Sequence, residues 1–203
     1  GFLVLCRGVR LAVTGTVQLI GGVAQLQSTG AASASFPSVS SSLIYSAQAY
    51  SAFPRALKLA DGSGYLIALK GGASHTGAGD GKILFSADFA SWSVRATISP
   101  ESPTNAVQEL VLCQHADGRV QLATRHYTDG SHASRNRVQY SSDNGATWTT
   151  AAAITGPSGF AYMTTRIGAD IYLATYDNSS AVNLYRFTGD TTAEFIANMG
   201  TAT

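Results

Sequence analysis

Two histidines occupy matching loops of the chain, His75 and His132, and each directly follows a serine. An imidazole can hydrogen-bond a sugar hydroxyl or ligate a metal ion. A metal site needs further ligands, and no third ligand lies at a suitable spacing from either histidine. The alternative, which we prefer, is that the histidines repeat only because the segment around them is duplicated. The two cysteines, Cys6 and Cys113, also lack metal-ligand spacing, so the sequence predicts neither a metal nor another cofactor.

Five charged side chains are suited to binding an acidic ligand or to acid–base chemistry: Arg55, Lys70, Asp80, Glu109 and Arg125. A guanidinium group fits a carboxylate through two parallel hydrogen bonds. A carboxyl group such as that of Asp80 can protonate a leaving oxygen if burial raises its pKa. Simpler interpretations stay open, in which Arg55 is an exposed residue at the start of a strand and Asp80 is an ordinary turn residue.

Charge is scarce in this chain. Only 12% of the 203 residues are Asp, Glu, Lys or Arg, against about 25% in ordinary soluble domains. The 13 basic and 12 acidic side chains nearly cancel, which leaves no global field to attract nucleic acid or an anionic membrane. The longest apolar run, Phe2–Cys6, is far shorter than the roughly 20 residues that cross a bilayer. We therefore expect neither a nucleic-acid partner nor a membrane span.

The first 50 residues differ from the rest in composition. They contain two arginines but no Asp, Glu or Lys, and residues 28–42 are mostly Ser, Ala and Gly, which is typical of a linker or long surface loop. Residues 11–27 alternate apolar with polar or small residues. We expect a low-charge β segment with a linker over 1–50 and a repeat array over 51–203. Because the chain begins with glycine and lacks a signal-peptide pattern, we also expect it to be an excised piece of a longer protein.

The remaining sequence predicts an all-β protein. Short segments rich in β-branched and aromatic residues are separated by Gly, Asp, Asn and Ser. We expect strands at 55–60, 65–70, 82–87, 108–114, 119–125, 137–142, 170–176 and 183–187.

These segments belong to an internal repeat. Residues 57–98 match residues 112–154 element by element at an offset of 55 to 57 residues, and a weaker third copy begins near residue 160. A repeat of roughly 50 residues with four short strands is typical of one blade of a β-propeller. In such a blade the loop after the second strand and the entry to the first strand share one face. We expect the long loops 71–81 and 127–136 to lie there, with Lys70, Glu109 and Arg125 on or near strands that approach this face.

The second repeat contains a sequence motif in the turn after its third strand. Its pattern is S-x-D-x-G-x-T-W, formed by Ser141, Asp143, Gly145, Thr147 and Trp148, and the first repeat has a shorter form with Asp88 and Trp92. The aspartate can accept backbone hydrogen bonds inside its own turn, the glycine supplies a positive φ, and the tryptophan can pack between neighbouring blades. We expect these residues to be structural.

This motif resembles the Asp box, or BNR repeat, of the sialidase superfamily, and the resemblance covers about residues 53–187. It implies four-stranded propeller-type blades, of which the chain holds about three, too few to close a ring. It also implies that Arg55 corresponds to one of three arginines that clamp a substrate carboxylate, and that Asp80 is placed like the family's acid/base aspartate. The other two arginines and the Tyr/Glu nucleophile pair are missing, and we expect Tyr162 and Tyr176 to be strand residues only.

Two functions from different classes follow from these observations. The first is a non-catalytic glycan-binding or structural module of an extracellular or virion protein, such as a phage tail fibre. In it the binding residues would be Arg55, Lys70, His75, Glu109, Arg125 and His132, and other chains would complete or cap the open edges, including copies of this chain. The second is a sialidase-type glycoside hydrolase that cleaves terminal acidic sugars, with Asp80 as its catalytic acid/base.

Overall fold

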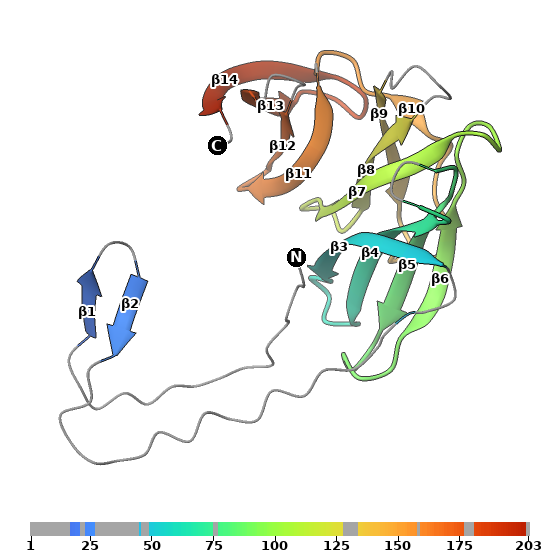
Figure 1. The fold of residues 1–203 in the computed structure, drawn as a ribbon, viewed down its shortest axis with the longest axis horizontal. Coiled ribbons are helices and arrows are strands. Elements are labelled where there is room, and N and C mark those ends of the chain that lie inside the picture. Colours follow the sequence, from blue (N-terminus) through green and yellow to red (C-terminus); the bar gives the residue numbers. More distant parts are fainter. Residues whose placement is uncertain are drawn as a thin grey trace. The chain divides into compact units, whose positions relative to one another are not determined.

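The fold is given by a computed structural model, which describes residues 17–20, 23–26, 45, 49–74, 77–127, 134–157, 159–176 and 181–201 (Figure 1). Residue contacts divide the chain into two units, Gly1–Leu43 and Ile44–Thr203. In the first unit, β1 (Val17–Ile20) and β2 (Val23–Leu26) form an antiparallel hairpin. Among the described residues there is no helix of the length and hydropathy needed to cross a membrane.

The second unit consists of three four-stranded antiparallel sheets, each of which follows the chain order without a crossover. Sheet 1 comprises β3 (Tyr50–Lys58), β4 (Tyr65–Gly72), β5 (Gly81–Ser86) and β6 (Ser93–Ile98). Sheet 2 comprises β7 (Ala106–Gln114), β8 (Val120–Tyr127), β9 (Ser134–Ser141) and β10 (Ala152–Ala153). Sheet 3 comprises β11 (Phe160–Ile167), β12 (Asp170–Tyr176), β13 (Ala181–Phe187) and β14 (Ala193–Thr201). The all-β prediction is confirmed, and the eight expected segments coincide with strands of these sheets.

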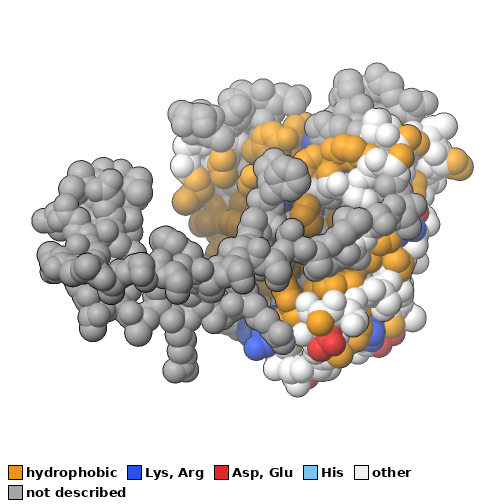
Figure 2. Space-filling view, turned by 60° about the horizontal axis from the view of Figure 1, so that its bottom comes forward, with side chains coloured by type: hydrophobic (Ala, Val, Ile, Leu, Met, Phe, Trp, Pro, Cys, Tyr) orange, Lys and Arg blue, Asp and Glu red, His pale blue; other side chains and the backbone are white. Residues whose placement is uncertain are grey.

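The core lies between successive sheets, because neighbouring residues of a strand face opposite ways. On β8, Leu122 packs with residues of sheet 1, whereas Ala123 packs with residues of sheet 3. The first strands of the sheets contact each other in order, β3 with β7 and β7 with β11. All nine residues of β7 are therefore buried. On the face shown in Figure 2, hydrophobic and uncharged side chains make up most of the coloured surface.

Short parallel bridges tie each sheet to the next. Gly79, in the loop between β4 and β5, pairs with Ala106 at the start of β7. Thr155, which follows β10, pairs with Thr192 directly before β14. The loop of one sheet is thus hydrogen-bonded to a strand of its neighbour, which fixes the order in which the sheets pack.

Candidate functional site

One end of sheets 1 to 3 gathers the start of each first strand and the end of each second strand. The antiparallel register places Tyr50 opposite Gly72, Ala106 opposite Tyr127, and Phe160 opposite Tyr176. The β4–β5 and β8–β9 loops leave the sheets at this same end. We call it the loop end, and it is the face on which the sequence predicted a binding site.

Each first strand carries a β-bulge near the loop end. The register shifts between Ala52 and Arg55 in β3, between Gln108 and Val111 in β7, and between Ala161 and Met163 in β11. Bulges twist a strand and re-aim its side chains, and they are frequent beside functional sites.

Two bulge residues have a backbone conformation that only glycine adopts freely. The φ angles are 54° at Phe53 and 41° at Glu109. The bulge also allows Val107 and Leu110, three residues apart, to pack into the same cluster between sheets 1 and 2. The extra residue in β7 thus places Glu109 in the strand while the core residues on both sides of it keep their packing.

Lys70 and Arg125 occupy equivalent register positions, each opposite the residue that precedes a bulge. Both cations are buried. The Lys70 ammonium donates to the carbonyl oxygens of Gly71 at 3.3 Å and Gly77 at 3.2 Å. Burial lowers the pKa of Lys70, and the negative charges of Asp80 and Glu109 oppose that shift. The loop end therefore has a positive group built into each of its first two sheets.

Arg125 is held from two sides. Its Nη1 donates to both carboxylate oxygens of Glu109 at 3.2 Å, and its guanidinium carbon lies 3.6 Å from the ring centroid of Phe160. The first contact joins β7 to β8, and the second joins sheet 2 to sheet 3. A buried ion pair with a stacked aromatic ring fixes the guanidinium in position.

An aromatic cluster of sheet 3 completes the loop end: Phe160, Tyr162 and Tyr176. Tyr176 meets Phe160 at 5.1 Å and Tyr162 at 5.7 Å between ring centroids, in both cases edge to face. Arg55 of sheet 1 lies 5.5 Å from the centroid of Tyr162, so residues of the first and third sheets meet here. The Tyr162 side chain is 50% exposed, and Arg55 is half-buried.

Arg55 has no ion-pair partner among the described residues. The six ion pairs found there involve other side chains. Within the same part of the chain, its guanidinium donates one hydrogen bond, from Nη1 to the Pro54 carbonyl at 3.4 Å. An arginine with donors to spare beside an exposed tyrosine can bind a carboxylate and an adjoining flat or apolar group together.

Asp80 lies beside this site but is already engaged. Its Oδ2 accepts a hydrogen bond from the Lys82 ammonium at 2.9 Å. Because an ammonium group occupies this oxygen, Asp80 is better placed as an ion-pair partner than as a proton donor.

The structure thus brings Arg55, Lys70, Glu109 and Arg125 together at the loop end, with Asp80 in the adjacent β4–β5 loop. His75 and His132 lie outside the described residues. Tyr162 and Tyr176 are strand residues as expected, yet they also belong to the site, which sequence reasoning missed. Their position could have indicated this role, because both tyrosines lie at the loop end of sheet 3, as the charged residues do in sheets 1 and 2.

The opposite end of the sheets carries the turn after β9. Asp143 Oδ1 accepts from the backbone nitrogens of Ala146 at 3.0 Å and Thr147 at 2.8 Å and from the Ser141 hydroxyl at 2.8 Å. The Thr147 hydroxyl and backbone, as the largest contributions, lower the pKa of Asp143 to about 2. Gly145 has a φ of 84° and sits against Leu66 and Ile83 of sheet 1. The Trp148 ring packs against the core between sheets 1 and 2, and its indole nitrogen donates to the Gly145 carbonyl.

The turn after β5 is built in the same way. Asp88 Oδ1 accepts from the Ser86 hydroxyl and from the backbone nitrogens of Ala90 and Ser91. Trp92 packs against a small cluster formed by β4 and β5. Both aspartates are exposed and bond within their own turns, away from the loop end.

No model of a known protein family matches the chain, and no curated protein matches it either. Among solved structures, the chain is similar to a protein of unknown function from Dyadobacter fermentans DSM 18053, with a TM-score of 0.57 and 16% sequence identity. The similarity covers 73% of this chain and 54% of that chain, so this chain spans about half the length of its structural neighbour. At this identity the likeness shows a shared all-β fold.

Proposed function

We propose that the chain is a non-catalytic glycan-binding module of an extracellular or virion protein, of the kind found in phage tail fibres, and that its loop end binds an acidic sugar. The observation that carries this proposal is Arg55, a half-buried arginine without a carboxylate partner among the described residues, next to the exposed ring of Tyr162. A sugar carboxylate would take the guanidinium donors while the carbon face of the same sugar packs on the tyrosine.

The buried layer beneath these two residues supports the proposal. Lys70, Arg125 and Glu109 are buried and together leave one net positive charge under the surface, where the field of a charge is screened less than in water. Glu109 balances Arg125 directly, and Lys70 is held by backbone carbonyls. These groups would favour an anion without touching it, and Arg55 and Tyr162 would make the contacts.

We further propose that sheets 1 to 3 are blades of an open β-propeller and that the Asp88 and Asp143 turns are Asp boxes of sialidase type. In support, each sheet is a four-stranded meander, successive first strands are in contact, and the two turns share one hydrogen-bond pattern. No sheet in the described part is closed on itself.

The two edge strands of sheet 3 carry exposed apolar side chains that suit a protein partner. Apart from Tyr162 of the proposed sugar site, large apolar side chains on β11 and β14 are exposed: Met163, Ile167, Phe195, Ile196 and Met199. Exposed apolar residues gathered on one sheet mark interaction surfaces. We propose that another protein chain, including a further copy of this one, contacts these five side chains.

The alternative function is a sialidase-type hydrolase with Asp80 as the acid/base. The observation in its favour is the position of Asp80 in the β4–β5 loop, beside Lys70 and at the same end as Arg55. The ion pair with Lys82 counts against it. Turnover of a fluorogenic sialoside that is lost in Asp80→Asn would establish the hydrolase and overturn the non-catalytic module.

The binding proposal is tested by applying the protein to an array of sialylated and neutral glycans. Wild-type protein should retain sialylated glycans without cleaving them, and Arg55→Ala and Tyr162→Ala should lose them. Arg166→Ala is the matched control, because Arg166 is an exposed arginine at the other end of β11 and should not matter. Equal retention by Arg55→Ala and Arg166→Ala would refute the site.

A further inference from the structure

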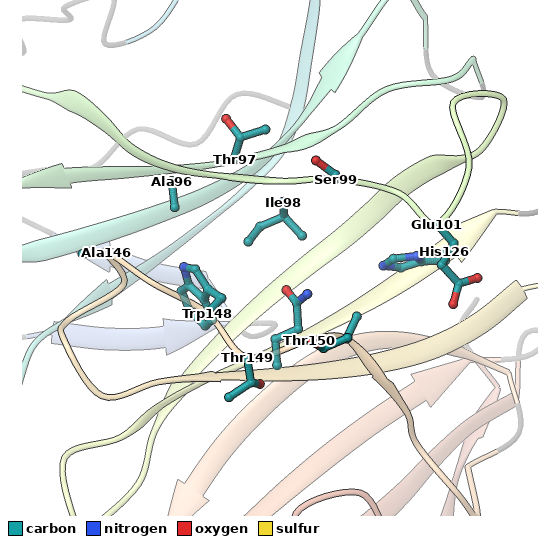
Figure 3. A pocket seen from close by; sticks show the side chains of 12 residues that line it. Ala96, Thr97, Ile98, Ser99, Glu101, His126, Ala146, Trp148, Thr149 and Thr150 are labelled. Carbon is teal, nitrogen blue, oxygen red and sulfur yellow. The ribbon is translucent and has the colours of Figure 1, made fainter.

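A groove of about 670 Å³ lies between sheets 1 and 2, and its lining includes neither Arg55 nor Tyr162 of the loop end. Thr97 and Ile98 of β6 form one wall, and Trp148 and Thr150 of the segment after β9 form the other. Figure 3 shows Trp148 toward one end of the groove and His126 beside Glu101 toward the other. Its volume is that of ordinary small-molecule sites.

The face of sheet 2 that meets sheet 1 changes from apolar to polar as it reaches this groove. Leu122 of β8 belongs to the apolar core, and Thr124 and His126 follow on the same face at two-residue spacing. Arg137 and Gln139 lie on the adjoining strand β9, opposite Thr124 and Leu122. The polar side chains therefore come from two neighbouring strands and point the same way.

Several of these buried polar atoms have no hydrogen-bond partner within the described part of the chain. They are Thr124 Oγ1, both ring nitrogens of His126, Arg137 Nε and Gln139 Oε1. His126 is fully buried, and Gln139 is 9% exposed. Buried polar groups are nearly always paired, because an unpaired one costs about 1–3 kcal/mol. Two of these residues, His126 and Gln139, line the groove.

The groove offers no unpaired charge within the described residues. Glu101 forms an ion pair with Arg137, which neutralises both. Burial lowers the pKa of His126 to about 4, with Glu101 opposing the shift and Arg137 adding to it, so the imidazole is neutral. A neutral imidazole has one donor and one acceptor, and the Gln139 carbonyl adds a second acceptor. A ligand that carries hydroxyls and no net charge fits these groups.

We propose that this groove binds a neutral sugar residue. On binding, the groove wall would open enough for the sugar hydroxyls to reach the buried polar atoms of His126 and Gln139. The half-buried indole of Trp148 would cover an apolar face of the ring. The site does not depend on the acidic-sugar site at the loop end, because the two share no residue.

The two tryptophans of the chain provide the test. Trp148 lines the groove, whereas Trp92 packs against a separate cluster in sheet 1. Their indole N–H signals in a nitrogen–proton correlation spectrum are assigned with Trp92→Phe. The full chain is then titrated with methyl glycosides of glucose, galactose, mannose and N-acetylglucosamine. At least one glycoside should shift the Trp148 signal saturably and leave the Trp92 signal in place.

Substitutions of residues in and outside the groove test where the glycoside binds. Gln139→Leu and His126→Phe should each weaken the active glycoside about tenfold or more, and Arg55→Ala should bind it like the wild type. If the variants do not fold, the wild-type titration still decides, because it reads the two tryptophans separately. Two results would overturn the proposal and mean that the groove holds water only. In the first, no glycoside shifts the Trp148 signal. In the second, the Trp148 and Trp92 signals shift together without saturating. Unchanged affinity in folded Gln139→Leu and His126→Phe would overturn it as well.

Discussion

At the scale of single residues, several charged groups of the chain are held by partners. Arg125 and Glu109 are paired in the interior, Lys70 is bonded to carbonyls, and Asp143 accepts four hydrogen bonds in one turn. Among the described residues, the Arg55 guanidinium has no carboxylate partner and donates one hydrogen bond, to the Pro54 carbonyl, much as the exposed Arg166 donates to the Gly168 carbonyl. Arg55 differs from Arg166 in its half-buried position against the Tyr162 ring, and this position is the reason we propose an anionic ligand there.

The Asp143 turn should contribute measurably to stability. Asp143→Ala leaves the Ala146 and Thr147 donors without their charged acceptor, and we expect a loss of about 2 kcal/mol in the free energy of unfolding. Chemical denaturation measures this loss. Asp170→Ala is the control, because Asp170 is also exposed and is not part of this turn. Equal unfolding midpoints for the two variants would mean that water replaces the turn hydrogen bonds without cost.

His126 should make stability depend on pH. Its pKa is about 4 in the folded protein and about 6.5 in the unfolded chain, so the unfolded state binds more protons between these values. The free energy of unfolding should therefore fall by about 3 kcal/mol as the pH drops from 6.5 to 4. Denaturation of wild type and His126→Gln across this window checks the sign and size.

In His126→Gln this fall should be absent, apart from what the facing Glu101–Arg137 pair contributes. His115→Gln keeps His126 and should keep the fall. A pH dependence that is the same in wild type and His126→Gln would show that the imidazole is hydrated in the folded state.

At the scale of elements, the bulges and bridges decide what the sheets can present. The bulges in β3 and β7 carry Phe53 and Glu109 at positive φ, and the bridges at Gly79 and Thr155 fix neighbouring sheets. A strand that packs on both faces tolerates an added residue only at such a bulge. This is why the loop end can hold charged groups directly above an apolar core.

The Thr155–Thr192 bridge between sheets 2 and 3 should be lost if a side chain is added beside it. Gly156 has a φ of 111°, and an added methyl group would collide with the Ala193 carbonyl, next to the Thr155–Thr192 pairing. We expect Gly156→Ala to cost about 3 kcal/mol of unfolding free energy, from backbone strain and loss of the bridge. Thermal or chemical unfolding measures it.

Gly168→Ala provides the comparison. Gly168 also has a positive φ, 62°, but no atom lies within 4 Å of its added methyl group. The strain alone should cost about 1 kcal/mol there. If both glycine variants lose the same amount, the bridge contributes nothing beyond the local backbone.

Local patterns predicted most strands but only part of the site. The eight expected segments were found. The strands β6 and β11 were not among them, and the two-residue β10 and the largely exposed β14 have no comparable pattern. The charged residues could be placed on one face by topology alone. The contact of Arg55 with Tyr162 could not, because it depends on how sheets 1 and 3 approach each other, which no short segment encodes. The bulges at Phe53 and Glu109 had no glycine to signal them.

At the scale of the whole molecule, the three sheets and their two main cores lie within Ile44–Thr203. The Ser-, Ala- and Gly-rich stretch over 28–42 lies outside this unit. The propeller arrangement and the partner at sheet 3 remain proposals, and both concern how this unit is completed.

The unit should fold without the residues that precede it. A chain of residues 44–203 should unfold with a free energy within about 1 kcal/mol of the full chain, because the buried clusters between the sheets are all retained. Circular dichroism during chemical denaturation measures both proteins. A large loss of stability in the shorter chain would show that residues 1–43 pack against the sheets.

The central claim is that Arg55 recognises the carboxylate of an acidic sugar, and calorimetric titration with sialyllactose and lactose tests it most directly. These ligands differ only in the acidic sugar, so any neutral-sugar binding in the groove contributes to both. Wild-type protein should bind sialyllactose at least about tenfold more tightly than lactose. This ratio of affinities should be smaller at high salt, and Arg55→Ala should abolish the difference. Equal affinity of the wild type for the two ligands, or a preference that survives in Arg55→Ala, would contradict the account.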